Sequence, residues 1–347
     1  MKEIARANLQ DVARAAGVSL ATVDRVLHCR AGVHARTIER VNAVVEQLGY
    51  RPDPAAARLA RNRKVRLAFV LPSGTNSFIT LLNQQVQAMA PWLAEQRTGA
   101  TVQTVDVFSP PALARHLARL QGQFDAVVVM ALDHPQVRAA IDDLVAHGTV
   151  VVTMVSDVPA SRRSHFVGID NVAAGRTAAT LLGRFVRPPA TGDARIGIVL
   201  GSQSLRDHAE RLFGFQQVMA SEYPGLRLLP PIEGNDLSER TEPLVAKLLK
   251  REPALAGLYS IGAGNRGIQA ALAASGRAQH VAWVCHELTP HARRALLDGV
   301  ADAVINQDAG HEVRSACRLA LAQLSGERVL ADQERIRIDI FVKDNLP

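Results

Sequence analysis

Eight residues with ligand-binding chemistry follow strand-like segments in the long second part of the chain: Ser73, Asn76, Phe78, Asp157, Arg211, Asn265, Glu287 and Gln307. In open α/β sheets ligands bind beyond the carboxyl ends of the strands. A carboxylate, a guanidinium and amides around an aromatic ring suit a polyol, because hydroxyls both donate and accept hydrogen bonds and sugar rings present apolar C–H faces. For any single residue the alternative is a helix cap or a loop position. Taken together, the set predicts a site for a small polar ligand.

A glycine pattern in the same region points to different chemistry. Gly262, Gly264 and Gly267 form a G-x-G-x-x-G that follows a strand and precedes a helix, and Glu287 lies 20 residues beyond the last glycine. That spacing imitates a dinucleotide-binding fingerprint. The motif lies deep in the chain rather than in the first βα unit of a domain. An NAD-binding enzyme therefore stays as an alternative and not as the main prediction.

Two further patterns fail on spacing or context. The segment from His286 to His291 is one residue too long for the zinc motif H-E-x-x-H, and Pro290 interrupts it. Ser202, Asp207 and His208 have no G-x-S-x-G nucleophile elbow around them. We expect these three to line the ligand cleft, and we predict no catalytic residue, no metal and no cofactor.

Strands and helices alternate from Arg66 onward, which is typical of βαβ units and parallel sheets. Strands are expected at 67–71, 102–107, 126–130, 150–155, 167–169, 196–200, 226–229, 258–261, 281–285 and 303–305. Helices are expected at 79–95, 111–121, 134–146, 173–185, 210–222, 237–251, 266–274, 289–297 and 310–324. Ten strands exceed one compact doubly wound domain, so we expect two lobes with the ligand between them.

The first fifty residues predict three short helices. Apolar residues recur at helical spacing over Leu9–Ala16, Leu20–Leu27 and Ala35–Leu48, with Gly17 and Gly49 after the first and third and Ser19 as an N-cap before the second. Two short helices joined by a tight turn and supported by a third indicate a helix-turn-helix, whose second helix fits a DNA major groove about 12 Å wide. The alternative is a generic small helical bundle.

Charge separates this head from the body of the chain. Residues 1–64 hold 12 basic and 6 acidic side chains, whereas the other 283 hold 28 and 27. A basic head on a near-neutral body favours a polyanionic partner for the head. No apolar run is long enough to span a membrane, no signal peptide precedes the head, and Cys29, Cys285 and Cys317 form no disulfide framework. These features predict a cytoplasmic protein.

Two segments make the chain recognisable. D-V-A-R-A-A-G-V-S-L-A-T-V-D-R-V-L (Asp11–Leu27) and L-G-Y-R-P-D-P-A-A-A-R-L (Leu48–Leu59) closely resemble the head of the lactose-repressor (LacI/GalR) family of transcriptional regulators. The resemblance implies that base edges are read by Leu20, Ala21 and Arg25, that phosphates or the packing around them involve Leu9, Ser19, Thr22 and Tyr50, and that Ala56 and Leu59 of a hinge helix enter the minor groove. A plain linker helix is the alternative for that hinge segment. Asp24, His28 and Ile38 depart from the usual pattern, which puts the operator sequence in doubt.

The body resembles type I periplasmic solute-binding proteins, as it does throughout that family. The resemblance implies that each of the eight residues named first matches a sugar-contacting position. It also implies a helix-turn-helix domain at 1–50, a hinge at 51–64, and a two-lobed α/β domain at 65–347 with crossovers near 169–172, 304–307 and 330–334. We expect a homodimeric repressor of double-stranded operator DNA, controlled by a sugar, polyol or sugar acid. The main alternative is a solute-binding protein of a transport system.

Overall fold

A computed structural model describes residues 7–27, 32–50, 64–74, 76–186, 194–262 and 264–347. Its contacts divide the chain into two compact units, the head Met1–Lys64 and the body Val65–Pro347. The hinge positions Ala56 and Leu59, together with His28 and Cys29, lie outside the described residues.

Three helices form the head: α1 (Leu9–Ala16), α2 (Leu20–Leu27) and α3 (Ala35–Gln47). Asn8 and Asp11 form a capping box at the start of α1, and Gly17 ends this helix in a left-handed conformation with φ of 62°. The Ser19 hydroxyl accepts a hydrogen bond from the backbone N–H of Thr22 and caps α2. The helices share a small core made of Val12, Ala13, Ala16, Val23, Val26 and Val41. The three predicted helices are therefore confirmed.

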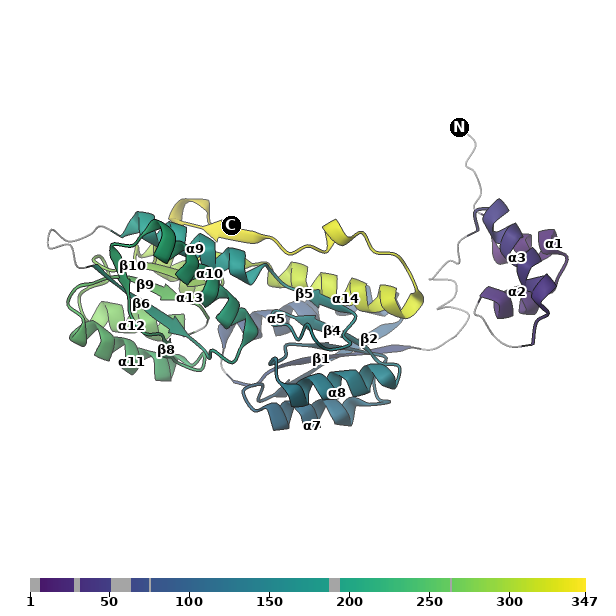
Figure 1. Cartoon of the computed structure of the whole chain (residues 1–347), viewed down its shortest axis with the longest axis horizontal. Coiled ribbons are helices and arrows are strands. Elements are labelled where there is room, and N and C mark those ends of the chain that lie inside the picture. The colour runs from purple at the N-terminus through teal and green to yellow at the C-terminus, as the bar shows by residue number, and fades with distance from the viewer. Residues whose placement is uncertain (1–6, 28–31, 51–63, 75, 187–193, 263) are drawn as a thin grey trace, which may run out of the picture. The chain divides into compact units, whose positions relative to one another are not determined.

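Lobe 1 of the body is a five-stranded parallel sheet in the order β2-β1-β3-β4-β5. Its strands are β1 (Val65–Pro72), β2 (Thr98–Val105), β3 (Ala126–Val129), β4 (Val150–Met154) and β5 (His165–Val167). Its helices are α5 (Ser77–Ala88), α6 (Ala90–Glu95), α7 (Pro110–Leu120), α8 (Pro135–Ala146) and α14 (Ala309–Ser325). Alternate residues of β1 face opposite ways: Leu67 and Phe69 join the core under α5 and α14, whereas Ala68 and Val70 join the core under α7 and α8 (Figure 1).

Lobe 2 is built on a sheet in the order β12-β11-β10-β9-β6-β7, in which only the β11–β12 pair is antiparallel. Its strands are β6 (Ala194–Leu200), β7 (Leu226–Leu228), β8 (Ile232–Glu233), β9 (Leu255–Ser260), β10 (Ala282–His286), β11 (Ala303–Gln307) and β12 (Ile338–Phe341). Its helices are α9 (Asn171–Phe185), α10 (Arg206–Glu222), α11 (Ser238–Arg251), α12 (Asn265–Ala274) and α13 (Pro290–Leu297). The chain passes between the lobes three times: after β5, after β11 and after α14. No described helix combines the length and apolar character needed to cross a bilayer.

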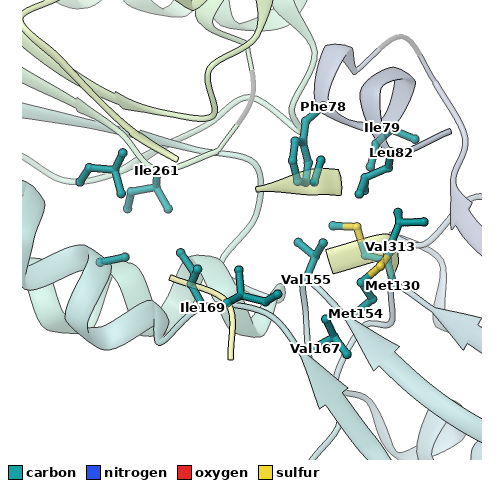
Figure 2. Packing of buried hydrophobic residues seen from close by; sticks show 14 of the residues in the cluster. Phe78, Ile79, Leu82, Met130, Met154, Val155, Val167, Ile169, Ile261 and Val313 are labelled. Atoms are coloured by element: carbon teal, nitrogen blue, oxygen red, sulfur yellow. The ribbon is translucent and has the colours of Figure 1, made fainter. Parts of the chain in front are cut away.

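One apolar core continues from lobe 1 into lobe 2. Figure 2 shows part of this cluster, with Met130 and Met154 from lobe 1, Val313 from α14, and Ile261 from lobe 2. The shared core fixes the carboxyl ends of both sheets close to one another. Those ends carry the polar residues described below.

Helices α9 and α10 approach each other closely because glycines occupy their crossing. A Cβ atom on Gly175 would lie 1.9 Å from the Arg211 carbonyl oxygen, and one on Gly214 would lie 2.1 Å from the Val172 carbonyl oxygen. Neither neighbour is a flexible side-chain end. The glycines therefore allow Arg211 on α10 to sit beside the first residues of α9.

Replacing Gly175 by Ala is expected to lower the free energy of unfolding by about 1–3 kcal/mol, because the methyl group forces the two helix backbones apart. Gly225→Ala is the matched control, since no heavy atom lies within 4 Å of its added Cβ, and its effect is expected to stay within about 0.5 kcal/mol. Urea unfolding followed by tryptophan fluorescence measures both. Equal stability of the two variants would contradict the close approach.

Candidate effector site and DNA-binding surface

A buried guanidinium organises the carboxyl end of the lobe 2 sheet. Arg211 is 2% exposed, and it projects from α10 beneath the crossing with α9. Its Nε donates to Oδ1 of Asn171 at 2.8 Å, and its Nη1 donates to the Ile261 carbonyl oxygen at 2.9 Å. Nη2 lies 3.7 Å from Oε1 of Glu287. The Arg211 guanidinium thereby contacts the start of α9 and the residues that directly follow β9 and β10.

Glu287 faces Arg211 from a strained position directly after β10. Its φ is 66°, which is uncommon for a residue other than glycine. The Glu287 carboxylate accepts from the side-chain amide of Gln307 at 2.8 Å and from the Gln307 backbone N–H at 3.3 Å. Burial raises the pKa of Glu287 to about 7, although Arg211 and the two Gln307 hydrogen bonds act to lower it.

The ends of β9, β10 and β11 thus bring together four of the predicted residues: Arg211, Asn265, Glu287 and Gln307. Asn265 accepts from the Ser260 hydroxyl and donates to the His286 carbonyl oxygen, so its amide ties β9 to β10. Gln307 keeps its Oε1 buried without a partner. A cation, a carboxylate and two amides at one sheet edge provide both donors and acceptors for hydroxyl groups.

Three further residues complete this group: Asp207 and His208, which the sequence predicts at the cleft, and Glu312, which it does not single out. Asp207 and His208 lie on the first turn of α10, with 3.6 Å between Oδ2 of Asp207 and Nε2 of His208. Glu312 lies on the first turn of α14, and its pKa is raised by burial and by the charges of Glu287 and Asp207, against the opposing charge of Arg211. We call Asp207, His208, Arg211, Glu287, Gln307 and Glu312 the inner polar cluster. A lone acid on the apolar face of the 310–324 helix was the signal that could have revealed Glu312.

A cleft of about 640 Å³ opens between the lobes, and the residues that line it do not include those of the inner polar cluster. Its lobe 1 side includes Phe108 and Asp133, and its lobe 2 side includes Ser202 and Arg206. The volume suits a small ligand. The backbone N–H of Ser202 donates to Nδ1 of His208 at 3.4 Å, which connects the cleft wall to the inner polar cluster. An ion pair of 3.2 Å between Arg206 and Asp133 bridges the two lobes at the cleft.

Ser73 and Asn76 line a second and much smaller cavity of about 30 Å³, together with Phe108, Asn235 and Asp236. That volume holds about one water molecule. Oδ1 of Asn76 also caps α5 by accepting from the backbone N–H groups of Phe78 and Ile79. Both residues therefore lie at the junction of the lobes, and Asn76 has a capping role as well.

Two of the predicted site residues have other contacts in the structure and do not line the cleft. Phe78 is 6% exposed, and its ring packs in the apolar core with Ile79 and Met130 (Figure 2). Asp157 is engaged on the loop after β4, where its carboxylate accepts from Arg163, from the Thr153 hydroxyl and from the Val158 backbone N–H. An aromatic ring does line the cleft, but it is Phe108, which follows β2.

The glycine motif serves packing. A Cβ on Gly262 would meet the side chains of Asp236 and His208, and one on Gly267 would lie 2.3 Å from the Ser238 carbonyl oxygen. Gly264 has a φ of 98° and is the N-cap of α12. These close approaches hold α12 against α11, and protein atoms occupy the space in front of the motif.

The two remaining motifs also have structural roles. Nε2 of His286 hydrogen-bonds the Tyr259 hydroxyl at 2.8 Å within the core. Ser202 contacts His208 through its backbone N–H rather than its hydroxyl, whereas a nucleophilic serine needs a bond from its hydroxyl to the base. Within the ranges that the structure describes, no group of three or more His, Cys, Asp or Glu side chains is arranged to hold a metal ion.

On the head, α2 presents Leu20, Ala21 and Arg25 to solvent, and Leu20 is 43% exposed. Val23 and Val26 of the same helix are buried. Ser19 and Thr22 share a hydrogen bond between their hydroxyls at the start of α2. Leu9 and Tyr50 are partly buried and pack against the head core. Helix α2 therefore buries one face in the head core and exposes Leu20, Ala21 and Arg25 on the other.

Comparison with known proteins identifies both units. The family model described as bacterial regulatory proteins, lacI family, matches residues 8–53. The model described as periplasmic binding protein domain matches residues 67–328. A crystal structure of a glucose-galactose binding protein from Geobacillus stearothermophilus superposes with a TM-score of 0.72 at 20% identity, covering 82% of this chain and 99% of that one. A putative LacI transcriptional regulator from Bacteroides fragilis has a TM-score of 0.69 at 16% identity, with coverages of 82% and 98%. These two similarities show the fold.

Curated relatives are transcriptional regulators. The HTH-type transcriptional regulator DegA of Bacillus subtilis is 26% identical over 216 residues, which are 62% of this chain and 61% of that protein. The HTH-type transcriptional regulator TreR of Salmonella typhimurium is 34% identical over 125 residues, which are 36% and 38% of the two chains. The alignments thus cover less than two thirds of either relative. The chain belongs to the periplasmic binding protein domain family over most of its length and joins that domain to a head of the bacterial lacI family.

Proposed function

We propose that this protein is a transcriptional regulator that binds operator DNA through α2 and responds to a small sugar-like effector held between its two lobes. The observation that carries the proposal is one chain that combines a lacI-type head with a two-lobed body whose cleft adjoins a buried polar cluster. Repression is the expected outcome of operator binding. The protein acts as a cytoplasmic homodimer without catalytic activity.

The effector site in this proposal consists of the inner polar cluster, Asn265, and the junction residues Ser73 and Asn76. Solved neighbours of the same fold support a sugar-like ligand: one from Burkholderia graminis was crystallised with D-arabinose, and another from Agrobacterium vitis with alpha-D-tagatopyranose. An effector can control operator affinity only if it binds one lobe arrangement better than another. The Arg206–Asp133 ion pair joins the two lobes at the cleft in the lobe arrangement of this structure.

Replacing Arg25 by Ala is expected to weaken binding to the operator by about 1–3 kcal/mol, or roughly 5- to 150-fold, if this guanidinium reads a guanine edge. The measurement is fluorescence anisotropy of the full-length protein on the DNA upstream of its own gene. Increasing salt should weaken wild-type binding steeply, because the basic head displaces counterions from the phosphates.

Arg14→Ala on α1 is the matched control, because it removes one positive charge from the head at a position paired with Asp11. Its effect is expected to be smaller and equal on specific and non-specific DNA. If Arg25→Ala binds its operator as tightly as the wild type, the assignment of the recognition surface fails.

A further inference from the structure

Glu312 is a buried acid that the fold itself does not satisfy. Its side chain is fully buried on the first turn of α14, and neither of its carboxylate oxygens has a hydrogen-bond partner. The Ser315 hydroxyl, one helical turn further along, is also buried without a partner. Buried polar groups are nearly always paired, and an unpaired buried carboxylate is strongly destabilising. A carboxyl group in this setting therefore points to a partner from outside the chain.

The charges around Glu312 are mostly negative. Glu287, Asp207 and Asp308 act on it from β10, α10 and the segment before α14, and Arg211 is the cation that acts on it. Arg211 is already bonded to Asn171 and to the Ile261 carbonyl oxygen, and it lies next to Glu287. Burial and the neighbouring acids raise the pKa of Glu312 well above its ordinary value. One guanidinium therefore faces more carboxyl groups than it neutralises.

The unpartnered atoms of the inner polar cluster are mainly acceptors. They are Oδ1 of Asp207, Oε1 of Gln307 and both oxygens of Glu312, whereas the donor side offers Nη2 of Arg211. A neutral sugar hydroxyl supplies donor and acceptor equally, and a sugar acid supplies additional acceptors. An ammonium group supplies three donors, no acceptor and a positive charge. Among the described residues, no group of three or more His, Cys, Asp or Glu side chains is arranged to hold a metal ion.

We propose that the effector is an amino sugar or amino polyol whose ammonium group binds Glu312. This inference rests on the proposed function, because it assumes that the effector occupies the inner polar cluster. The ammonium group donates to the Glu312 carboxylate, while Arg211 and Gln307 take the ligand's hydroxyl groups.

The test uses the full-length protein and three matched sets of compounds: hexosamines, the parent neutral hexoses, and the corresponding hexuronates. Isothermal titration calorimetry gives the affinity of each. A hexosamine is expected to bind most tightly. Its N-acetyl derivative, which is uncharged, is expected to bind with an affinity that is lower by about tenfold or more.

Glu312→Gln keeps the side-chain size, removes the charge, and is expected to weaken hexosamine binding by about tenfold or more. Glu312→Met provides a second variant that also removes the buried polar atoms. Asp302→Asn is the control, because Asp302 is an exposed acid that directly precedes β11 and accepts a hydrogen bond from the Trp283 backbone N–H. It is expected to bind the hexosamine like the wild type.

Tightest binding of a neutral hexose or a hexuronate would overturn the amine assignment and leave the proposed function standing. If hexosamine affinity is unchanged in both Glu312→Gln and Glu312→Met, the amine assignment is likewise overturned and the proposed function stands. If no compound of any of the three classes binds the wild-type protein, both the amine assignment and the sugar-like effector of the proposed function are overturned.

Discussion

Replacing Arg211 by Met is expected to lower the free energy of unfolding of the body by about 3–5 kcal/mol, the usual cost of removing one partner from a buried charge pair. The substitution leaves Glu287 and Glu312 buried without the cation that acts on both of them. It also leaves the Ile261 carbonyl oxygen and the Asn171 amide without their donor. Urea unfolding followed by the fluorescence of Trp92 and Trp283, which lie in lobe 1 and lobe 2, measures the loss.

The double variant Arg211→Met, Glu287→Gln shows how much of the stability lost in Arg211→Met comes from the unpaired Glu287 carboxylate. Because Gln removes the uncompensated carboxylate, it should restore part of the stability that Arg211→Met loses, and a double-mutant cycle gives the coupling between the two side chains. Arg206→Met on the same helix is the control. Its ion pairs are partly exposed, so its effect is expected to stay below about 1 kcal/mol. An additive double variant would show that Arg211 does not stabilise the fold through Glu287.

The wild-type protein is expected to lose about 3 kcal/mol of stability through Glu287 as the pH rises from about 4.5 to 7. The ordinary pKa of a glutamate is 4.5, and burial raises that of Glu287 to about 7. Over this interval the unfolded chain releases the Glu287 proton while the folded chain retains it, so rising pH favours unfolding. Above about pH 7 both states have released the proton, and this contribution becomes constant.

Glu287→Gln isolates this contribution from that of all other groups. The difference in unfolding free energy between the wild type and this variant should change with pH below about 7 and level off above it. Asp302→Asn is again a useful control, because its carboxyl lies away from the inner polar cluster and accepts from the Trp283 backbone N–H. A difference that does not vary between about pH 5 and 8 would contradict the raised pKa.

The sequence predicts most of the elements, because local signals set their bounds. Ser19, Gly17 and Gly49 act within a few residues of the helix ends that they define, and α1 and α2 begin and end where they were expected. The α/β fold class of the body is confirmed as well. Strand β8, by contrast, has two residues and exists through its pairing with β6. A segment so short carries no pattern of its own.

The site was harder to predict, because its geometry depends on which face each residue occupies. Arg211, Glu287 and Gln307 follow strands and do meet at the sheet edge. Phe78 also follows a strand, but the first turn of α5 directs its ring into the core. Asp157 is paired with Arg163 on the same loop, and nothing in the local sequence marks that pairing. Glu312 was missed because its burial depends on the passage of α14 from lobe 2 back to lobe 1.

That passage of α14 also constrains the order in which the protein folds during synthesis and the way in which its gene can recombine with that of a relative. Lobe 1 needs a helix encoded after almost all of lobe 2, and lobe 2 needs β12, which follows that helix. During synthesis the chain emerges from its amino end, so the head can fold early, whereas lobe 1 is complete only once α14 has left the ribosome and lobe 2 only once β12 has. A single lobe cannot be exchanged with a relative as one continuous gene segment. The continuous gene segments that can be exchanged are the one that encodes the whole body and, separately, the one that encodes the head.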